Sequence, residues 1–233
     1  KKDFASPNGP ILLLSAKGST TASIAEANGV KDFSGNGNHG QAFGGVTVLD
    51  GGEGFAFDGT NGRIMILRNF GISNTRFCTM SIRFKMTNNP SSSVIAWFGP
   101  SNETRAIIGV FTSNNIFYIN VNKNERAINN FYPLLNKEYH LVVVADDSKA
   151  RLYVDGEMIQ ELEIVYTEYV AGRLGIGARI NDTTASSFSY PFCGNIRDFH
   201  IYPRALSAAE VKYLYNGFQP NIIIGQTIPS GTI

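Results

Sequence analysis

The sequence predicts an all-β protein folded as an antiparallel β-sandwich, and three observations lead to this fold class. Short segments rich in β-branched and aromatic residues recur along most of the 233-residue chain. Asn-Gly and Asp-Gly turn signals separate many of them, and no helical pattern joins consecutive strands as a βαβ unit requires. Several segments also alternate apolar and polar residues, which is typical of strands with one buried and one wet face.

The expected strands follow from this pattern in chain order. They are 45–50, 54–59, 63–68, 77–86, 92–99, 105–111, 116–121, 139–146, 150–156, 159–165, 172–178 and 195–202. The alternation is clearest in 77–86. It places Met80, Ile82, Phe84 and Met86 on a core face and Ser81, Arg83 and Lys85 on a face toward solvent.

One short helix is expected near the end of the chain. Ser207 and Glu210 form a capping box, in which the Ser207 hydroxyl serves as N-cap and Glu210 reaches back to it. Val211, Leu214 and Tyr215 then supply an apolar face, and Gly217 suits the position after the helix.

Composition excludes several classes of function. The 20 basic and 19 acidic residues nearly cancel and are scattered, so no basic stripe for a nucleic-acid backbone is present. No apolar run approaches the roughly 20 residues that span a bilayer, so membrane insertion is not expected. The two cysteines form neither a disulfide framework nor a zinc set.

The loop DFSGNGNHG, residues 32–40, raises the question of a phosphate or metal site. Its glycines are not spaced as GxGxxG, and no Gly-Lys-Ser/Thr motif is present, so a phosphate loop is not indicated. One interpretation is a tight turn in which Asp32 accepts hydrogen bonds from downstream amides. The other is a structural Ca²⁺ site, because Ca²⁺ binds carboxylate and carbonyl oxygens.

Four segments, taken in order, carry a resemblance to a known family. They are DFSGNGNHG, GFAFDGTNGRIMI, YHLVVVADDSKARLYVDGEMI and FCGNIRDFHIYPRALSAAEVKYLYN. Together they resemble the laminin-G-like, concanavalin A-like jelly-roll family, which includes the pentraxins. The resemblance implies two packed antiparallel sheets in a jelly roll, on a secreted, cell-surface or virion-surface protein that binds glycans or proteins. It divides the chain into an N-terminal extension 1–29, a jelly-roll domain 30–217 and an apolar extension 218–233.

The resemblance also bears on metal and thiols. It implies that loop 32–40 lies near the closing strand, so Asp32, Asn36 and Asp198 are the candidate ligands of one structural calcium ion. The acidic cluster of the pentraxin calcium site is missing, since the corresponding segment reads ARINDTTASS. The resemblance further makes 77–86 and 193–202 antiparallel neighbours, with Cys78 and Cys193 at opposite ends. We therefore expect two free thiols.

No catalytic constellation stands out, so an enzyme is not expected. Glu161 and Glu163 share a strand face, but a solvated face explains them without the carboxylate pair of a glycosidase. Trp97, the only tryptophan, is the candidate for stacking on a sugar, and packing in the core is the competing interpretation.

The segment 221–233 contains five isoleucines and no charged residue. Such a segment must be covered by its own sandwich or by another copy of the chain. In the second case, the expected subunit contacts are Ile222, Ile223, Ile224 and Ile228.

The sequence leaves two hypotheses for the function. The first is a non-catalytic recognition or adhesion module that binds carbohydrate, and the second is a self-assembling subunit of a fibre, pilus or capsid. The partner is accordingly a glycan or glycoprotein, or other copies of the chain.

Overall fold

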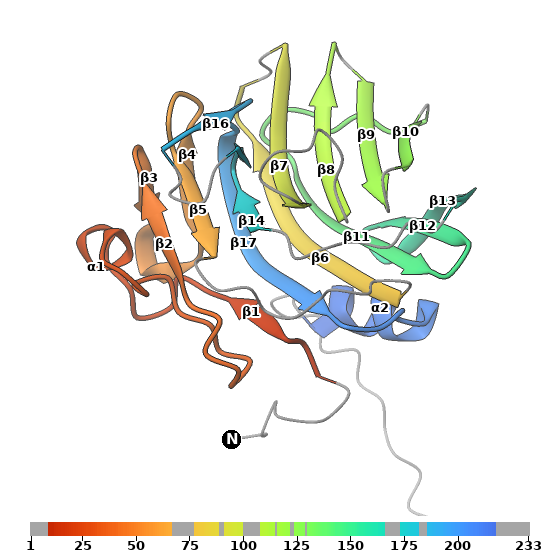
Figure 1. Cartoon of the computed structure of the whole chain (residues 1–233), viewed down its shortest axis with the longest axis horizontal. Helices are drawn as coiled ribbons and strands as arrows, with labels where there is room; N and C mark the ends of the chain where they lie inside the picture. Colours follow the sequence, from red (N-terminus) through yellow and green to blue (C-terminus); the bar gives the residue numbers. More distant parts are fainter. Residues whose placement is uncertain are drawn as a thin grey trace, which may run out of the picture.

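The computed structural model describes residues 9–66, 77–88, 91–99, 108–114, 116–121, 124–128, 130–165, 173–181 and 186–217. These residues form two antiparallel sheets packed face to face, with a small two-stranded hairpin beside them (Figure 1). The arrangement confirms the all-β fold class. In the described part of the chain, no helix is long and apolar enough to cross a membrane.

The first sheet has eight strands, and its central neighbours are β11, β6 and β17. Strand β1 joins it by pairing with β17, so the start of the described chain closes onto the last strand. The strands in spatial order are β13 (Glu157–Glu163), β12 (Lys149–Val154), β11 (Glu138–Asp146), β6 (Phe77–Met86), β17 (Cys193–Tyr202), β4 (Phe55–Asp58) and β3 (Val46–Val48), with β1 (Leu12–Leu14) beside β17.

The second sheet has seven strands and presents one face to the first sheet. Its order is β10 (Asn124–Ile128), β9 (Ile116–Val121), β8 (Ile108–Ser113), β7 (Ser92–Gly99), β14 (Arg173–Ile176), β5 (Arg63–Ile66) and β2 (Gly40–Phe43). The hairpin of β15 (Arg179–Ile180) and β16 (Phe188–Ser189) follows β14. Its Ile180 and Phe188 pack with Met65 and Phe43, which are outside the main core.

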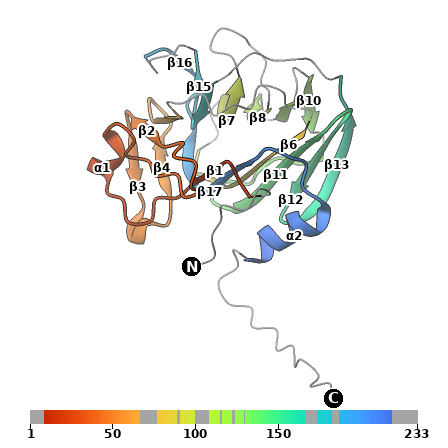
Figure 2. The ribbon, with the colours of Figure 1, turned by 60° about the horizontal axis from the view of Figure 1, so that its bottom comes forward.

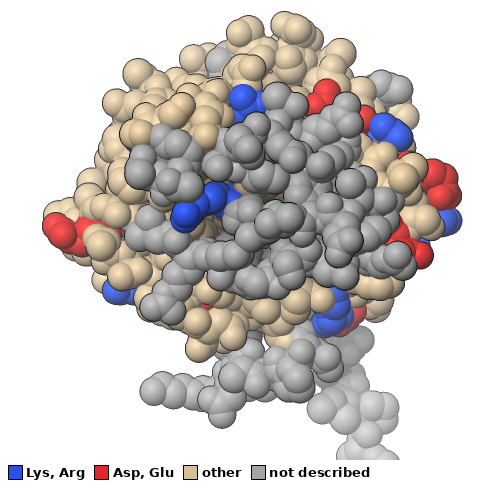
Figure 3. Space-filling view, viewed as in Figure 1, with Lys and Arg blue, Asp and Glu red and all other residues tan. Residues whose placement is uncertain are grey.

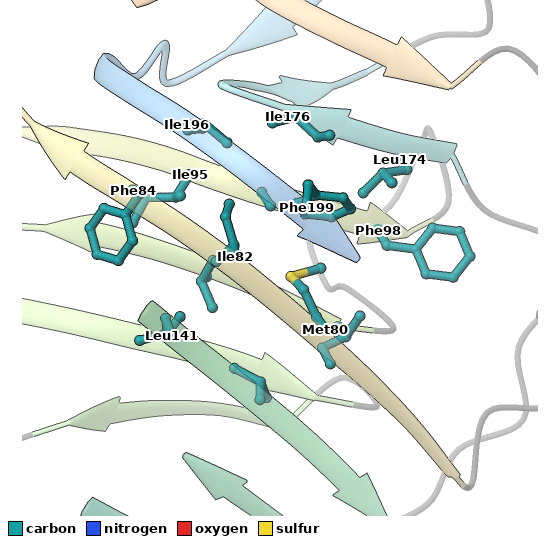
Figure 4. Packing of buried hydrophobic residues seen from close by; sticks show 14 of the residues in the cluster. Met80, Ile82, Phe84, Ile95, Phe98, Leu141, Leu174, Ile176, Ile196 and Phe199 are labelled. Atoms are coloured by element: carbon teal, nitrogen blue, oxygen red, sulfur yellow. The ribbon is translucent and has the colours of Figure 1, made fainter. Parts of the chain in front are cut away.

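The main core lies between the two sheets. Figure 4 shows Met80, Ile82 and Phe84 of β6 beside Ile95 and Phe98 of β7, with Phe199 of β17 close to them. All these side chains are almost completely buried. Burial of apolar area on this scale is the dominant stabilising term of a sandwich.

The helices are short and lie outside the two sheets. Helix α1 (Thr21–Ala25) lies beside β2 and β3, the edge strands of the two sheets, and a 3₁₀ turn (Asp50–Gly52) joins β3 to β4. Helix α2 (Ala208–Gly217) lies against the outer surface of the first sheet (Figure 2). The predicted capping box of α2 is confirmed. The Ser207 amide donates to Glu210 Oε2 at 2.9 Å, and the Glu210 amide donates to Ser207 Oγ at 3.3 Å.

The expectation that the second face of β6 is wet is wrong for two of its three residues. Ser81 and Arg83 are 1% and 3% exposed, while Lys85 is partly buried. The reason is α2, which covers the outer surface of the sheet and packs Val211 on Val142 and Val144 of β11. Strand alternation therefore assigns the faces correctly, but it does not say whether a second layer covers the outer face.

The two cysteines are free, as expected. Strands β6 and β17 are antiparallel neighbours, with Thr79 opposite Tyr202 at one end and Met86 opposite Gly194 at the other. Cys78 lies at the first end, whereas Cys193 lies at the second, where its Sγ is 3.5 Å from Thr87 Oγ1. Burial raises the pKa of the Cys78 thiol to about 12, so this cysteine stays protonated and inert.

Candidate functional site: a cavity beside Trp97

Trp97 lies on the outer face of the seven-stranded sheet, away from the main core. The register of β7 against β8 shifts between Val94 and Ala96, and this irregularity changes which residues face outward. Ile95, Ala96 and Phe98 belong to the core between the sheets. Val94 and Trp97 form a separate cluster with Phe111.

Both partners of Trp97 on the neighbouring strands are glycines. Trp97 is paired with Gly109 of β8 on one side and Gly175 of β14 on the other, and neither glycine places a side chain beside it. The aromatic surface continues along the sheet. The rings of Trp97 and Phe111 meet edge to face at 5.9 Å, and Phe111 stacks on Tyr118 at 4.9 Å. These distances are typical of favourable aromatic pairs.

A cavity of about 260 Å³ opens beside this aromatic surface. Trp97, Phe111 and Tyr190 form its aromatic wall. Its polar lining includes the hydroxyls of Ser92 and Ser113, whose Oγ atoms are 3.2 Å apart, and the charged side chains of Glu125 and Arg179. An aromatic wall opposite hydroxyl and charged groups is suited to a ligand with one apolar and one polar surface.

Three buried polar atoms in the walls of the cavity have no hydrogen-bond partner among the residues that the structure describes. They are Trp97 Nε1, Ser93 Oγ and Thr112 Oγ1, and all three residues are at most 4% exposed. Buried polar groups are normally paired, and an exception calls for water or a ligand nearby. These walls therefore have hydrogen-bonding capacity that the protein does not use.

The β15–β16 hairpin supplies the other end of the cavity. Arg179 Nε donates to Asn181 Oδ1 at 3.1 Å, and the guanidinium lies 5.3 Å from the centre of the Tyr190 ring. Tyr190 has φ = 58°, which is uncommon for a residue with a side chain. Its carbonyl accepts a hydrogen bond from Val94 at 2.9 Å, so the hairpin is attached directly to β7.

The loop 32–40 is closed by its own hydrogen bonds. Asp32 Oδ1 accepts from the amides of Leu13 and Ser34, at 3.0 and 2.9 Å. Asp32 Oδ2 accepts from Ser34 Oγ and the Asn38 amide, both at 2.8 Å. The hydrogen bonds from the Ser34 and Asn38 amides are those that the turn interpretation predicts for Asp32.

The other two candidate calcium ligands also have partners within the chain. The Asn36 amide group donates to Ser34 Oγ at 3.0 Å, and Asp198 Oδ2 lies 3.8 Å from Arg83 Nε. The described residues contain no group of three or more His, Cys, Asp or Glu side chains that could hold a metal ion. Calcium binding at Asp32, Asn36 and Asp198 stays a prediction.

Loop 32–40 and the closing strand meet at a second, larger groove of about 530 Å³. Its lining includes Leu13 and Phe33, Asp198 and His200 of β17, and Leu214 of α2. Gly217, the last described residue, also lines it. The predicted contact residues Ile222, Ile223, Ile224 and Ile228 lie outside the described residues.

Charged side chains beneath α2 are buried but paired. Arg83 Nη2 donates to the Tyr215 carbonyl at 2.9 Å, and Arg83 Nη1 lies 3.7 Å from Glu138 Oε1. His140 Nε2 is 2.9 Å from Ser81 Oγ, and its ring stacks on Tyr215. Burial, with Arg83 nearby, lowers the pKa of His140 to about 3 and that of His200 to about 4. Burial raises the pKa of Asp198.

Sequence reasoning identified Trp97 as a candidate but missed the residues that share its cavity. Arg179 and Tyr190 follow the expected strand 172–178, in a segment where the only feature noted from the sequence was the missing acidic cluster. The signal that could have found them is the pair of glycines beside Trp97, because an indole without cross-strand neighbours leaves space that other residues must enclose.

A family model for the concanavalin A-like lectin/glucanases superfamily, Laminin_G_3, matches residues 58–212. No curated protein matches the chain. Among solved structures, the chain is similar to the binding domain of botulinum neurotoxin serotype D, with 18% identity, a TM-score of 0.65 and coverage of 90% of this chain and 52% of that one.

Two further structures show the same fold. The binding domain of botulinum neurotoxin DC in complex with SialylT is 16% identical, with a TM-score of 0.67 over 90% of this chain and 51% of that one. A sialidase of Trypanosoma rangeli is 16% identical, with a TM-score of 0.62 over 88% of this chain and 32% of that one. This chain thus spans about half, or less, of the structures it matches, and the likeness concerns the fold.

Proposed function

Because the chain belongs to the concanavalin A-like lectin/glucanase superfamily, we propose that it is a non-catalytic recognition module that binds carbohydrate in the cavity beside Trp97. The observation that carries this proposal is the composition of the cavity. Trp97, Phe111 and Tyr190 form an aromatic wall, and hydroxyl and charged groups line the same space. Sugars need both surfaces, because a pyranose has an apolar C–H face and a rim of hydroxyls.

The size of the cavity fits a single sugar unit. Its volume of about 260 Å³ is below the roughly 300–1,000 Å³ typical of sites for drug-sized ligands. A terminal sugar of a glycan, with the rest of the chain outside, is therefore the expected occupant. Recognition of terminal sugars suits a secreted, cell-surface or virion-surface protein that attaches to glycans or glycoproteins.

A non-catalytic role is supported by the acidic groups of the cavity. A typical glycosidase pairs two carboxylates across the bond that it cleaves. Among the described residues that line the cavity, Glu125 is the only carboxylate. Glu161 and Glu163 lie elsewhere, on edge strand β13, where Glu161 pairs with Lys149 and Arg151 at 2.6 and 2.7 Å.

A glycan array probed with the labelled chain tests this proposal. We expect binding to a defined set of glycans and a loss of roughly tenfold or more in affinity for Trp97→Met, which fills space but lacks an aromatic face. Phe98→Met is the matched control, because Phe98 is the next residue and points into the core. Equal affinity of Trp97→Met and the wild type, or no glycan binding at all, would contradict the proposal.

The second candidate function is a self-assembling structural subunit, and the groove at Gly217 favours it. The groove is mostly apolar, and the uncharged segment 218–233 begins where the groove ends. An apolar segment from a neighbouring copy would bury its isoleucines there. Deleting residues 221–233 should then leave a folded chain and abolish assembly in analytical ultracentrifugation. A monomer that unfolds on deletion would instead place the segment on its own sandwich.

A further inference from the structure

The guanidinium of Arg179 has unused donors inside the cavity. An arginine has five N–H donors, and only Nε is engaged, with Asn181 Oδ1 at 3.1 Å. No carboxylate of the described residues forms an ion pair with Arg179, and its other contact is the Tyr190 ring. Within the described part of the chain, the two terminal nitrogens therefore have no hydrogen-bond partner, and they form the fork that binds a carboxylate or sulfate through two parallel hydrogen bonds.

The residues around Arg179 hold it in place. Asn181 accepts from Arg179 and donates through Nδ2 to Ser189 Oγ at 2.8 Å, so the amide is fixed at both ends. Tyr190 is held in its positive-φ conformation by the hydrogen bond from Val94. A rare backbone conformation that the surroundings hold in place is common at ligand sites. A pre-positioned arginine loses less entropy when it binds an anion.

Among the described residues, the carboxylate that lines the cavity, Glu125, is not fixed by neighbouring side chains as Arg179 is. Glu125 is exposed on β10, four strands from β14, after which the Arg179 hairpin begins. The fixed cation is at the hairpin end, and the exposed carboxylate is at the other end. A ligand with an anionic group fits when that group points to the hairpin, and Glu125 is then left to accept bonds from neutral hydroxyls.

We infer that Arg179, Asn181 and Tyr190 form an anion subsite of the cavity, so that the preferred ligand is a terminal sugar that carries a carboxylate or a sulfate group. This inference rests on the proposed carbohydrate-binding function and narrows its ligand class. The sugar ring lies along Trp97 and Phe111, and the anionic group accepts hydrogen bonds from the two terminal nitrogens of Arg179.

Matched pairs of glycans on one array test the inference. Each pair has the same backbone with and without its acidic group: sialyllactose and lactose, a glucuronide and a glucoside, and a sulfated and an unsulfated galactoside. We expect the acidic member of at least one pair to bind roughly 10- to 100-fold more tightly, as for hydrogen bonds between charged groups. The pair that shows the difference identifies carboxylate or sulfate as the source of the charge.

Three variants assign the effect to Arg179. Arg179→Gln should lower the affinity for the acidic glycan by roughly tenfold or more and that for its neutral partner by much less, so that the preference between the two disappears. Arg179→Lys keeps the charge but lacks the planar fork, so it should restore only part of the preference. Lys149→Gln removes one positive charge from a partly exposed site on the other sheet and should change the affinity for neither glycan.

The outcomes separate the inference from the function on which it rests. If acidic and neutral members bind equally, or Arg179→Gln keeps the preference, the anion subsite is refuted and carbohydrate binding at Trp97 stands. If the Trp97→Met and Phe98→Met variants have the same affinity for glycans, the cavity beside Trp97 is refuted as the binding site. If no glycan binds, both proposals are refuted.

Discussion

The outer surfaces of the two sheets differ in how each one holds an arginine side chain. On the eight-stranded sheet, α2 covers Arg83, and that arginine is paired with Glu138, Asp198 and the Tyr215 carbonyl. On the seven-stranded sheet, the β15–β16 hairpin leaves a cavity in which Arg179 has no carboxylate partner among the described residues. In the described part of the face that Figure 3 shows, basic and acidic side chains are scattered and form no large patch of one sign.

The difference shows how one strand pattern supports two kinds of polar residue. A charge that the chain neutralises, as at Arg83, contributes to the packing of a helix on a sheet. A charge that is held in place but left unneutralised, as at Arg179, is available to a ligand. We therefore expect changes beneath α2 to affect folding, and changes at the cavity to affect binding more than folding.

The largest expected effect is the loss of stability in acid. The pKa values of His140 and His200 are lowered to about 3 and about 4, from an ordinary value near 6.5, so both rings are neutral in the folded state. The unfolded chain binds protons first as the pH falls below 6.5. Stability is therefore full above about pH 6.5 and decreases toward pH 4 by on the order of 5 kcal/mol.

Two other groups beneath α2 modify this acid effect. Arg83 remains charged and adds to the repulsion of a protonated imidazole, whereas Asp198, with its raised pKa, takes up a proton in the folded state and opposes the loss. Urea denaturation at several pH values measures the sum. His140→Gln should flatten the curve, and a curve of unchanged slope would contradict the assignment to His140.

Arg83→Ala should be the most damaging single substitution beneath α2. It removes the buried cation beside Asp198 and the donor to the Tyr215 carbonyl, while Glu138 keeps its hydrogen bond from Arg197 at 2.6 Å. Breaking a fully buried ion pair from one side costs about 3–5 kcal/mol, and because the carboxylates of Glu138 and Asp198 are partly exposed we expect a loss at or below the lower end of that range. Chemical denaturation measures this loss.

Arg151→Ala is the control for that substitution, because Arg151 forms partly exposed ion pairs with Asp146 and Glu161 that are worth about 1 kcal/mol or less. Glycan affinity of the folded fraction should be unchanged in both variants. A similar loss of stability in the two variants would mean that burial of Arg83 beneath α2 does not increase its contribution to the free energy of unfolding.

Gly175→Ala should affect the cavity more than the fold. A Cβ at Gly175 would lie 2.5 Å from the Ala178 carbonyl and 2.7 Å from Ile180, so the β15–β16 hairpin must move. Overpacking of this kind costs about 1–3 kcal/mol. Because Arg179 is on that hairpin, we expect a larger relative loss in the affinity for acidic glycans, measured by calorimetry.

Gly217→Ala serves as the control for the glycine substitution, since a Cβ there meets no atom within 4 Å. It should change neither stability nor affinity by a measurable amount beyond the helix preference for alanine. Unaltered glycan affinity in Gly175→Ala would indicate that the hairpin position does not control the cavity.

The smallest expected effect is that of chelation. If Asp32, Asn36 and Asp198 hold Ca²⁺, its removal should lower the melting temperature through loss of a ligand of the folded state. Four protein donors already satisfy Asp32, so we expect about 1 kcal/mol or less, a shift of roughly 2–4 °C. Scanning calorimetry with and without excess chelator measures it, and identical melts would leave Asp32 as a turn residue only.

Much of the fold could be predicted from the sequence because its signals are local. Alternation along 77–86 predicts the core face of β6, and the Ser207–Glu210 pair predicts the start of α2. Asp32 followed by glycines predicts the turn that the structure contains. In each case the residues that interact are a few positions apart, so their spacing contains the necessary information.

The site depended on contacts that spacing does not encode. A register shift in β7 turns Trp97 outward, where its partners on the neighbouring strands are Gly109 and Gly175. The hairpin then brings Arg179 and Tyr190 to that space from a distant part of the chain. Likewise, Ser81 and Arg83 are buried only because α2 returns to cover them. The sequence by itself determined the strands, their core faces and their turns. Only the tertiary structure decided which outer face is covered and which one holds a cavity, because that depends on where distant segments pack.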